Sequence, residues 1–347
     1  MRFFWAKYKY RLLLFSSVFG PATITAISDN DAAGVATYSL AGAKFGYSIL
    51  IILIPITLLL AVTQEMGVRI ALVTGKGLGD LIRERYGVRV AITVFFILMI
   101  ANLGSIIANF AALKSAFHLF NLPVLPMLIG VLVLIILLVS KGSYKTNQRV
   151  FLFSVILYFS YVFSAFKANA DWGKALISMI NPSSVQLNKE YIFAAIAVLG
   201  TTITPWGQFF VQSYVIDKKL TADKLRYSQL ETYFGSMLTD FFSFFMIVAT
   251  AATLFTHGIS LISGDQAALA IKPFAGELAA YLFGLGFINA AIMGIVIISL
   301  TTAYVFSEFF GFVGSLDAPV ERGRLFYGIF IFQLLVGAVF LFFPFIS

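Results

Sequence analysis

Long apolar segments follow one another along the whole chain, and they constrain the fold more than any other feature. The hydrocarbon core of a bilayer is about 30 Å thick, so a helix of about 20 apolar residues crosses it. Nine segments have this length and character, namely Leu12–Ala43, Tyr47–Val73, Val88–Leu113, Leu122–Ser140, Val150–Ala168, Tyr191–Ile216, Ser236–Thr256, Gly276–Phe312 and Leu325–Phe345. The pattern predicts an all-α polytopic membrane protein in which each segment is one crossing.

Composition supports this prediction and excludes several other classes of protein. Only 12% of the residues are charged and 60% are apolar, whereas soluble domains carry about 25% and 45–50%. The absence of cysteine argues against a secreted disulfide module. The net charge of +8 comes from basic residues scattered between the apolar segments, so no nucleic-acid partner is expected. No cleavable signal peptide is evident before the first segment.

The basic residues predict the orientation in the membrane. With nine crossings, 18 of the 24 lysines and arginines fall on the side that holds the N-terminus. The positive-inside rule therefore places the N-terminus in the cytoplasm of a multi-pass cell-membrane protein. The segment Gly75–Gly87 is too polar to cross and is expected to form a short cytoplasmic helix or loop, and Asn169–Glu190 is expected to be an external polar connection. The other six basic residues lie outside, namely Lys44, Lys114, Lys167, Lys174, Lys189 and Lys272.

Acidic residues inside the apolar segments are the candidates for function, because burying a charge in a membrane is costly. Five qualify, namely Asp29, Asp31, Glu65, Asp240 and Glu308. Glu65 lies four residues before Arg69, which predicts an ion pair on one helix face. Asp240 and Glu308 lie nearer the ends of their segments, and their roles stay open.

The first segment contains a polar interruption at residues 28–34, with the sequence SDNDAAG. Asp29 and Asp31 are two residues apart and do not share a helix face. Irregular backbone at membrane depth is tolerated only where it is buried in protein or lines a polar cavity. Carboxylate and carbonyl oxygens suit a hard cation. An unwound, cation-binding segment is therefore predicted; the alternative is a capped helix break without a ligand.

The sixth segment contains a matching interruption at residues 200–208, GTTITPWGQ. Pro205 removes a helical hydrogen bond and clashes with the preceding turn, although a simple kink in a packed helix would look the same. Broken helices at corresponding positions of two halves are typical of inverted-repeat transporters with a binding site at the bilayer midplane. The repeats are expected at residues 12–170 and 191–347 of one transmembrane domain.

Three motifs resemble the natural resistance-associated macrophage protein (Nramp) family of divalent-metal transporters. They are GPATITAISDNDAAGVATYSLAGAKFGYS from residue 20, VTGKGLGDLIRERYG from residue 73 and LGTTITPWGQFF from residue 199. The resemblance implies a leucine-transporter-type inverted repeat with broken first and sixth helices, and divalent cations as substrates rather than cofactors. In register, Asp31 stands at the family's metal-binding aspartate. The residues expected at the ion are Asp31, Asp29, Ser28, Thr201, Thr204 and Gly34.

Departures from the family motifs indicate the subfamily. The family sequence Asp-Pro-Gly-Asn becomes Asp-Ala-Ala-Gly at residues 31–34, and Met-Pro-His becomes Thr-Pro-Trp at residues 204–206. Loss of the thioether removes a preference for soft metals, and loss of the larger side chains is expected to widen the cavity. The acidic residues of the family's proton route are replaced by Asn102 and Ser105. This pattern resembles the Nramp-related magnesium transporter branch, which implies Mg²⁺ and Mn²⁺ transport without proton coupling.

Other interpretations stay open. A proton-coupled Mn²⁺/Fe²⁺ transporter of the broader family is the first alternative, and a non-transporting membrane sensor or scaffold is a second one from a different class. An amino-acid transporter is disfavoured by the two carboxylates, and an enzyme by the lack of cysteine and by the loop positions of His118 and His257. No oligomer is required. The resemblance implies ten core helices, so the tenth, which completes the second repeat, is expected to be missing from this chain.

Overall fold

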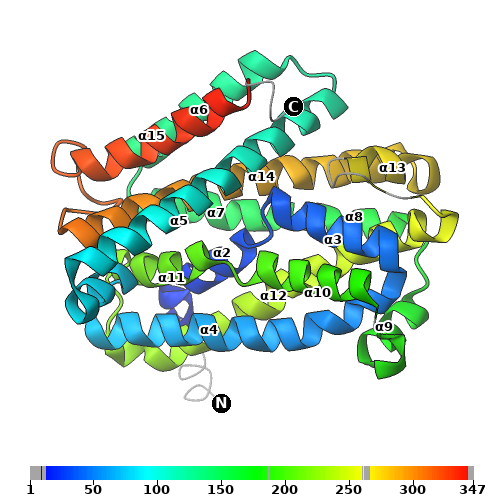
Figure 1. The fold of residues 1–347 in the computed structure, drawn as a ribbon, viewed down its shortest axis with the longest axis horizontal. Coiled ribbons are helices and arrows are strands. Elements are labelled where there is room, and N and C mark those ends of the chain that lie inside the picture. The colour runs from blue at the N-terminus through cyan, green and yellow to red at the C-terminus, as the bar shows by residue number, and fades with distance from the viewer. Residues whose placement is uncertain (1–8, 10–12, 187, 260, 262–265, 343–347) are drawn as a thin grey trace.

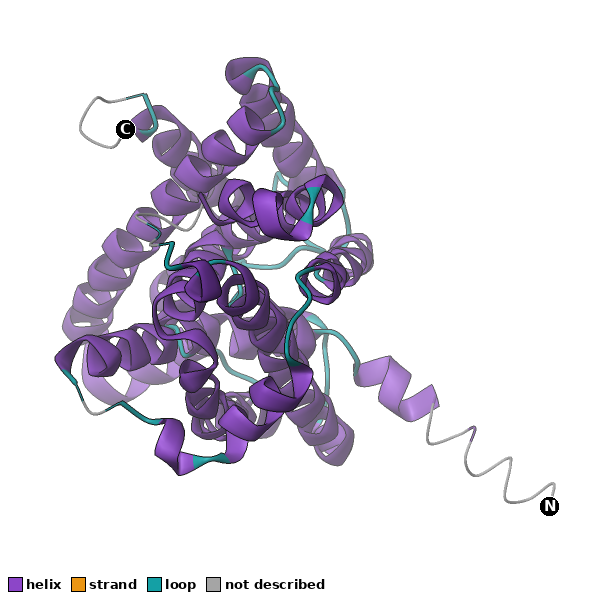
Figure 2. Cartoon of the chain, turned by 90° about the vertical axis from the view of Figure 1, so that its right-hand side faces the viewer, coloured by secondary structure: helices purple, strands orange, loops and turns teal. Residues whose placement is uncertain are grey.

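A computed structural model describes residues 9, 13–186, 188–259, 261 and 266–342, and every regular element in this part of the chain is helical (Figures 1 and 2). Residues 13–18 are helical. The further elements are α2 Pro21–Ser28, α3 Ala32–Phe45, η1 Gly46–Ile52, α4 Leu53–Thr74, α5 Leu78–Leu119, α6 Val124–Lys141, α7 Tyr144–Leu157, α8 Phe159–Lys167, α9 Trp172–Ile180, η2 Pro182–Ser184, α10 Lys189–Thr202, α11 Pro205–Asp217, η3 Ala222–Lys224, α12 Leu225–Thr253, η4 Phe255–His257, α13 Gln266–Ala275, α14 Glu277–Phe310 and α15 Arg324–Phe340.

Seven helical stretches of the described chain are long and apolar enough to cross a membrane. One of them, Ala32–Thr74, has 43 residues and contains the 3-10 segment η1 between α3 and α4. A straight helix of that length would measure about 65 Å, more than twice the bilayer core. The predicted ninth crossing corresponds to α15, an apolar helix of 17 residues that is shorter than these seven stretches. The protein is therefore an all-helical polytopic membrane protein.

Both predicted interruptions are present. Helix α2 ends at Ser28 and α3 starts at Ala32, while α10 ends at Thr202 and α11 starts at Pro205. Each second half begins with a side-chain cap: Asp31 Oδ1 accepts from the Gly34 N–H at 2.9 Å, and Thr204 Oγ1 accepts from the Gly207 N–H at 3.2 Å. Such caps satisfy backbone donors that a broken helix leaves free. The local sequence thus explains why both helices restart where they do.

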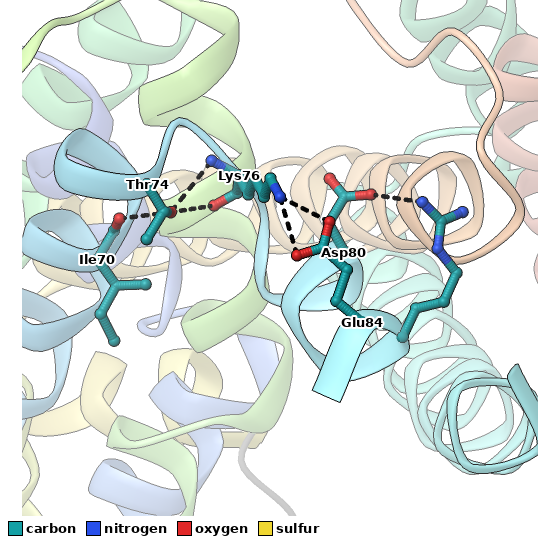
Figure 3. Close-up of polar contacts among 6 residues, drawn as sticks. Ile70, Thr74, Lys76, Asp80 and Glu84 are labelled. Atoms are coloured by element: carbon teal, nitrogen blue, oxygen red, sulfur yellow. Dashed lines mark hydrogen bonds and ion pairs between the residues drawn. The ribbon is translucent and has the colours of Figure 1, made fainter. Parts of the chain in front are cut away.

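The polar segment after α4 forms a short helix, as predicted. Helix α5 starts at Leu78, and Gly87 interrupts it with non-helical dihedral angles (φ 82°, ψ 171°). Figure 3 shows ion pairs that hold the segment: Lys76 Nζ donates to Glu84 at 2.6 Å, and Arg83 donates to Asp80 at 3.4 Å. The Lys76–Glu84 pair is exposed and the Arg83–Asp80 pair is half-buried. Pairs this accessible to solvent contribute little to stability.

Some local features were not predicted. The connection at residues 169–190 contains the helix α9, and the predicted fifth segment is divided at Tyr158 into α7 and α8.

The predicted ion pair on α4 is confirmed, with Arg69 Nη2 3.1 Å from Glu65 Oε2.

Helices α12 and α14 form the centre of the bundle. In the most apolar part of each helix, 72% of α12 and 78% of α14 is buried inside the protein, against 17% of α6. Figure 1 shows α6 and α15 along one edge of the molecule and α4 along the opposite edge, with the broken helices between them. The first break is buried at Asp29–Asp31, whereas in the second Ile203 and Thr204 are half-buried and Pro205 is exposed. Unwound backbone at membrane depth is tolerated where it is buried in protein or lines a polar cavity.

Candidate metal centre

Asp29 lies in the break between α2 and α3 and is only 1% exposed. Its Oδ1 accepts a hydrogen bond from Thr204 Oγ1 at 2.6 Å. Its Oδ2 is 3.4 Å from Gln64 Nε2 on α4. The contact with Thr204 brings the two helix breaks together, although 175 residues separate these positions in the sequence. Convergence of the two breaks is what the inverted-repeat prediction requires.

Asp31 is the second buried carboxylate of the break and is 5% exposed. In addition to the capping bond from Gly34, Asp31 Oδ2 accepts from Asn109 Nδ2 on α5 at 2.8 Å. Asn109 also accepts from the Ala32 N–H at 3.0 Å through its Oδ1. One neutral side chain therefore holds both the carboxylate and the first turn of α3.

The negative charge of these two carboxylates has no counter-ion within the described residues. No ion pair among the described residues involves Asp29 or Asp31, and no group of three or more acidic or histidine side chains gathers there. The contacts of both aspartates come from hydroxyl, amide and backbone N–H groups. Burial of an unpaired charge costs several kcal/mol. A bound cation with oxygen ligands would remove this cost, and such ligands suit a hard divalent ion.

The other predicted site residues lie at different places relative to the carboxylates. Thr201 lies beside the first break, where its Oγ1 is 3.4 Å from the position that a Cβ on Gly34 would take. Ser28 is fully buried, but its hydroxyl donates to the Ile24 carbonyl within α2 at 2.7 Å. In this conformation the Ser28 hydroxyl is used by its own helix.

The predicted widening of the cavity at Gly34 is wrong in this conformation. A Cβ there would lie 2.7 Å from the Asp29 carbonyl oxygen and 3.6 Å from Asp31 Oδ1. The space left by the absent asparagine is therefore occupied by the backbone of the break. Glycine fits residue 34 because the first turn of α3 passes close to the Asp29 carbonyl oxygen.

We expect Gly34→Ala to destabilise the protein by about 1–3 kcal/mol, because the clash is with backbone that cannot move away freely. The measurement is the midpoint of thermal unfolding in detergent. The matched control is Gly104→Ala on α5, where a Cβ would have nothing within 4 Å; it should leave stability unchanged or raise it slightly. Equal midpoints for the two variants would contradict the close approach at Gly34.

Two site residues were missed by the sequence analysis. Asn109 and Gln64 are neutral and fully buried, and they contact Asp31 and Asp29. Asn109 lies seven residues after Asn102, hence on the same face of α5, and this spacing was the available signal. Gln64 Oε1 is buried without a hydrogen-bond partner. A polar oxygen left unsatisfied beside a carboxylate is a candidate ligand for an ion or for its water.

A third missed residue, Glu231 on α12, holds the start of α2. It is 1% exposed and accepts from the backbone N–H groups of Gly20, Ala22 and Thr23 at 3.0, 3.3 and 2.8 Å. Lys218 Nζ donates to the neighbouring Phe19 carbonyl at 2.6 Å. Burial lowers the pKa of Lys218 to about 8, partly offset by Glu231. Glu231 thus anchors the half-helix that carries Asp29 at its end.

Asp240 and Glu308 are separate from the two aspartates in their contacts. Asp240 Oδ2 accepts from Thr57 Oγ1 at 2.5 Å. Glu308 accepts from Ser213 Oγ at 2.5 Å and from the Gly79 N–H at 2.9 Å. Glu308 therefore joins α14 to α11 and to the start of α5. In the described part of the chain, neither Asp240 nor Glu308 is hydrogen-bonded or ion-paired to Asp29 or Asp31.

Comparison with known proteins gives a consistent set of similarities. The model of the family described as natural resistance-associated macrophage protein-like matches residues 22–347. The divalent metal cation transporter MntH of Yersinia enterocolitica is 26% identical over 307 residues, which covers 85% of this chain and 74% of that protein. MntH of Erwinia tasmaniensis is 27% identical over 306 residues, which cover 85% of this chain and 73% of that protein.

A solved structure has a similar fold. The manganese transporter of Eremococcus coleocola, in complex with an aromatic bis-isothiourea substituted compound, aligns with a TM-score of 0.69 and 18% identity. The alignment covers 94% of this chain and 71% of that one. At this identity the similarity concerns the fold alone.

Proposed function

The chain belongs to the Nramp family, and from this premise we propose that it moves Mg²⁺, and also Mn²⁺, across the cell membrane by alternating access and without coupled protons. Membership of the family makes the protein a divalent metal cation transporter and not an enzyme. The observation that carries the proposal is the pair of buried, unpaired carboxylates, Asp29 and Asp31, where the two helix breaks meet. The proposed ligand set remains Asp31, Asp29, Ser28, Thr201, Thr204 and Gly34.

The preference for Mg²⁺ is supported by the chemistry of the donors. The side chains on the two carboxylates carry oxygen and amide groups, and Thr204 stands where the family carries a thioether. Thioether sulfur favours soft metals, whereas oxygen donors favour Mg²⁺, Ca²⁺ and Mn²⁺. These features also support assignment to the Nramp-related magnesium transporter branch.

The absence of proton coupling is supported by the neutral groups between α5 and α14. Asn102 Nδ2 donates to Thr302 Oγ1 at 2.8 Å, and both side chains are buried. Gln333 of α15 is also buried, with neither side-chain polar atom hydrogen-bonded within the described residues. Asparagine, threonine and glutamine do not titrate near neutral pH, so they cannot carry a net proton with the ion.

We expect purified protein in liposomes to take up Mg²⁺ and Mn²⁺ without acidifying the lumen. The experiment follows ion uptake with an indicator for each metal and proton movement with an enclosed pH dye, under an inward ion gradient. Liposomes without protein are the control. Proton entry in proportion to Mn²⁺ uptake, with Mg²⁺ excluded, would instead establish the proton-coupled alternative. Metal binding without any flux would establish a sensor.

The proposed topology has nine crossings, a cytoplasmic N-terminus and two repeats at residues 12–170 and 191–347. The unequal distribution of basic residues supports this orientation. We expect an impermeant maleimide applied to intact cells to label Lys174→Cys and to leave Lys145→Cys unlabelled until the membrane is opened. Both lysines are exposed, and the natural chain has no cysteine to give background. The reverse labelling pattern would show that the N-terminus lies outside the cell, opposite to the proposed orientation.

A further inference from the structure

An apolar groove lies on the lipid-facing side of the molecule, where α4, α12 and the helix α9 meet. Its volume is about 670 Å³, and its walls include Leu58, Phe166, Trp172, Leu176, Met237 and Phe245. Leu58 and Met237 are 63% and 67% exposed, so the groove is open to the surroundings of the protein. Pockets of about 300–1,000 Å³ with apolar and aromatic walls are the usual size for organic ligands.

A buried acid lies among these apolar walls. Asp240 lines the groove and is 5% exposed. Thr57 satisfies its Oδ2, whereas its Oδ1 is buried without a hydrogen-bond partner. No lysine, arginine or histidine of the described chain forms an ion pair with Asp240. A carboxylate at membrane depth is costly and normally has a partner, and here the protein supplies only one hydroxyl.

The negative charge of Asp240 restricts the chemistry of a ligand. The phosphate of a phospholipid headgroup would repel this carboxylate, so the group beside it must be cationic or neutral. An aromatic cluster lies beside the acid, with the Phe241 and Phe245 rings 4.9 Å apart and the Phe166 and Trp172 rings 4.8 Å apart. Aromatic faces attract organic cations.

We propose that the groove binds a membrane-soluble amine, whose apolar body lies against the aromatic rings and whose ammonium group is bound by the carboxylate of Asp240. The ligand carries one positive charge and no anionic group. A charge-assisted hydrogen bond to Asp240 orients it, and the apolar walls supply the contact area. Asp240 shares no hydrogen bond with the proposed metal ligands in the described part of the chain, although it is near enough for its charge to act on Asp29. Binding of the amine does not require transport.

The test measures binding of monodansylcadaverine, a fluorescent primary amine, to the full chain in phosphatidylcholine nanodiscs, with empty nanodiscs subtracted. We expect saturable binding of one molecule per chain. Asp240→Asn, which keeps an acceptor for Thr57, should weaken binding at least about tenfold, because the ion pair is lost. The neutral N-acetyl derivative of the probe should not bind saturably.

A second variant keeps the test decisive if Asp240→Asn does not fold. Leu58→Trp fills the groove from an exposed position on α4 and should weaken binding to a similar degree. Leu134→Trp, at a position 64% exposed on α6, is the matched control and should bind like the natural chain. Equal binding to the Asp240→Asn and natural proteins, or equal binding of the neutral derivative, would overturn the proposal. Displacement of the probe by phosphatidylethanolamine in the nanodiscs would also overturn it, in favour of a lipid.

Discussion

Replacing Asp31 by asparagine is expected to lower Mg²⁺ and Mn²⁺ uptake in liposomes about a hundredfold. The change removes one of two unpaired negative charges from a buried site, and the loss of one partner of a buried charge interaction costs about 3–5 kcal/mol. The same variant should lose the thermal stabilisation that millimolar Mg²⁺ gives the natural protein, because an ion stabilises only the state that binds it.

The control for this experiment is Asp223→Asn, which removes the same charge from an exposed position in the short 3-10 helix η3. It should leave uptake and the stabilisation by Mg²⁺ unchanged. Uptake by the Asp31→Asn protein within about threefold of the natural protein would remove Asp31 from the proposed ligand set. A thermal midpoint measured without metal shows whether each variant is folded.

Asp29 tests the second half of the same site. In Asp29→Asn the Thr204 hydroxyl still has an acceptor. The new amide replaces the oxygen that accepts from Gln64 Nε2, and it can donate to Gln64 Oε1, which has no partner in the natural protein, once the Gln64 side-chain amide turns over. We therefore expect Asp29→Asn to be at least as stable as the natural protein without metal, yet to be defective in uptake. If Asp29→Ala transports normally, Asp29 is not a ligand, directly or through water.

Replacing Glu231 by alanine is expected to lower the free energy of unfolding by about 3–5 kcal/mol. The start of α2 supplies three buried N–H donors, from Gly20, Ala22 and Thr23, and all three bind Glu231. Pro21 has no N–H, so this carboxylate accounts for the donors of the first turn. Each buried donor left unsatisfied costs about 1–3 kcal/mol. The measurement is equilibrium unfolding in mixed micelles.

Two further variants test whether the loss of stability in Glu231→Ala comes from the lost hydrogen bonds to α2. Glu231→Gln keeps one acceptor oxygen and should lose less stability than Glu231→Ala. Glu190→Ala removes an acid that is 69% exposed in its ion pair with Lys44, and it should change stability by less than about 1 kcal/mol. A Glu231→Ala protein as stable as the Glu190→Ala protein would show that Glu231 does not anchor α2.

The sequence was enough to predict features that depend only on neighbouring residues in the chain, such as helix breaks and ion pairs within one helix. The break in the first crossing follows from two aspartates, a serine and an asparagine in a short run, and the break in the sixth from Pro205. Asp31 and Thr204 cap the helices that follow, which explains why the predicted positions agree with the observed ones. Similarly, the pair Glu65–Arg69 depends only on helical spacing.

Boundaries and faces were harder to predict. The seventh crossing was expected to start at Ser236, but α12 starts at Leu225. Glu231 therefore lies outside the predicted segment, and no role was predicted for it. Asn109 and Gln64 are neutral, and neutral residues in apolar segments give no signal of their own. Their importance depends on which helix face points toward the breaks, and this depends on the packing of α4 and α5.

The apolar segments and their interruptions were determined by the sequence itself, because membrane thickness and backbone hydrogen bonding act on each segment separately. Only the tertiary structure decided that Thr204 contacts Asp29, that Asn109 holds Asp31 and that the backbone of Asp29 fills the space beside Gly34. These contacts join residues from separate helices. Their geometry is set by how the helices pack together, and no single segment contains that information.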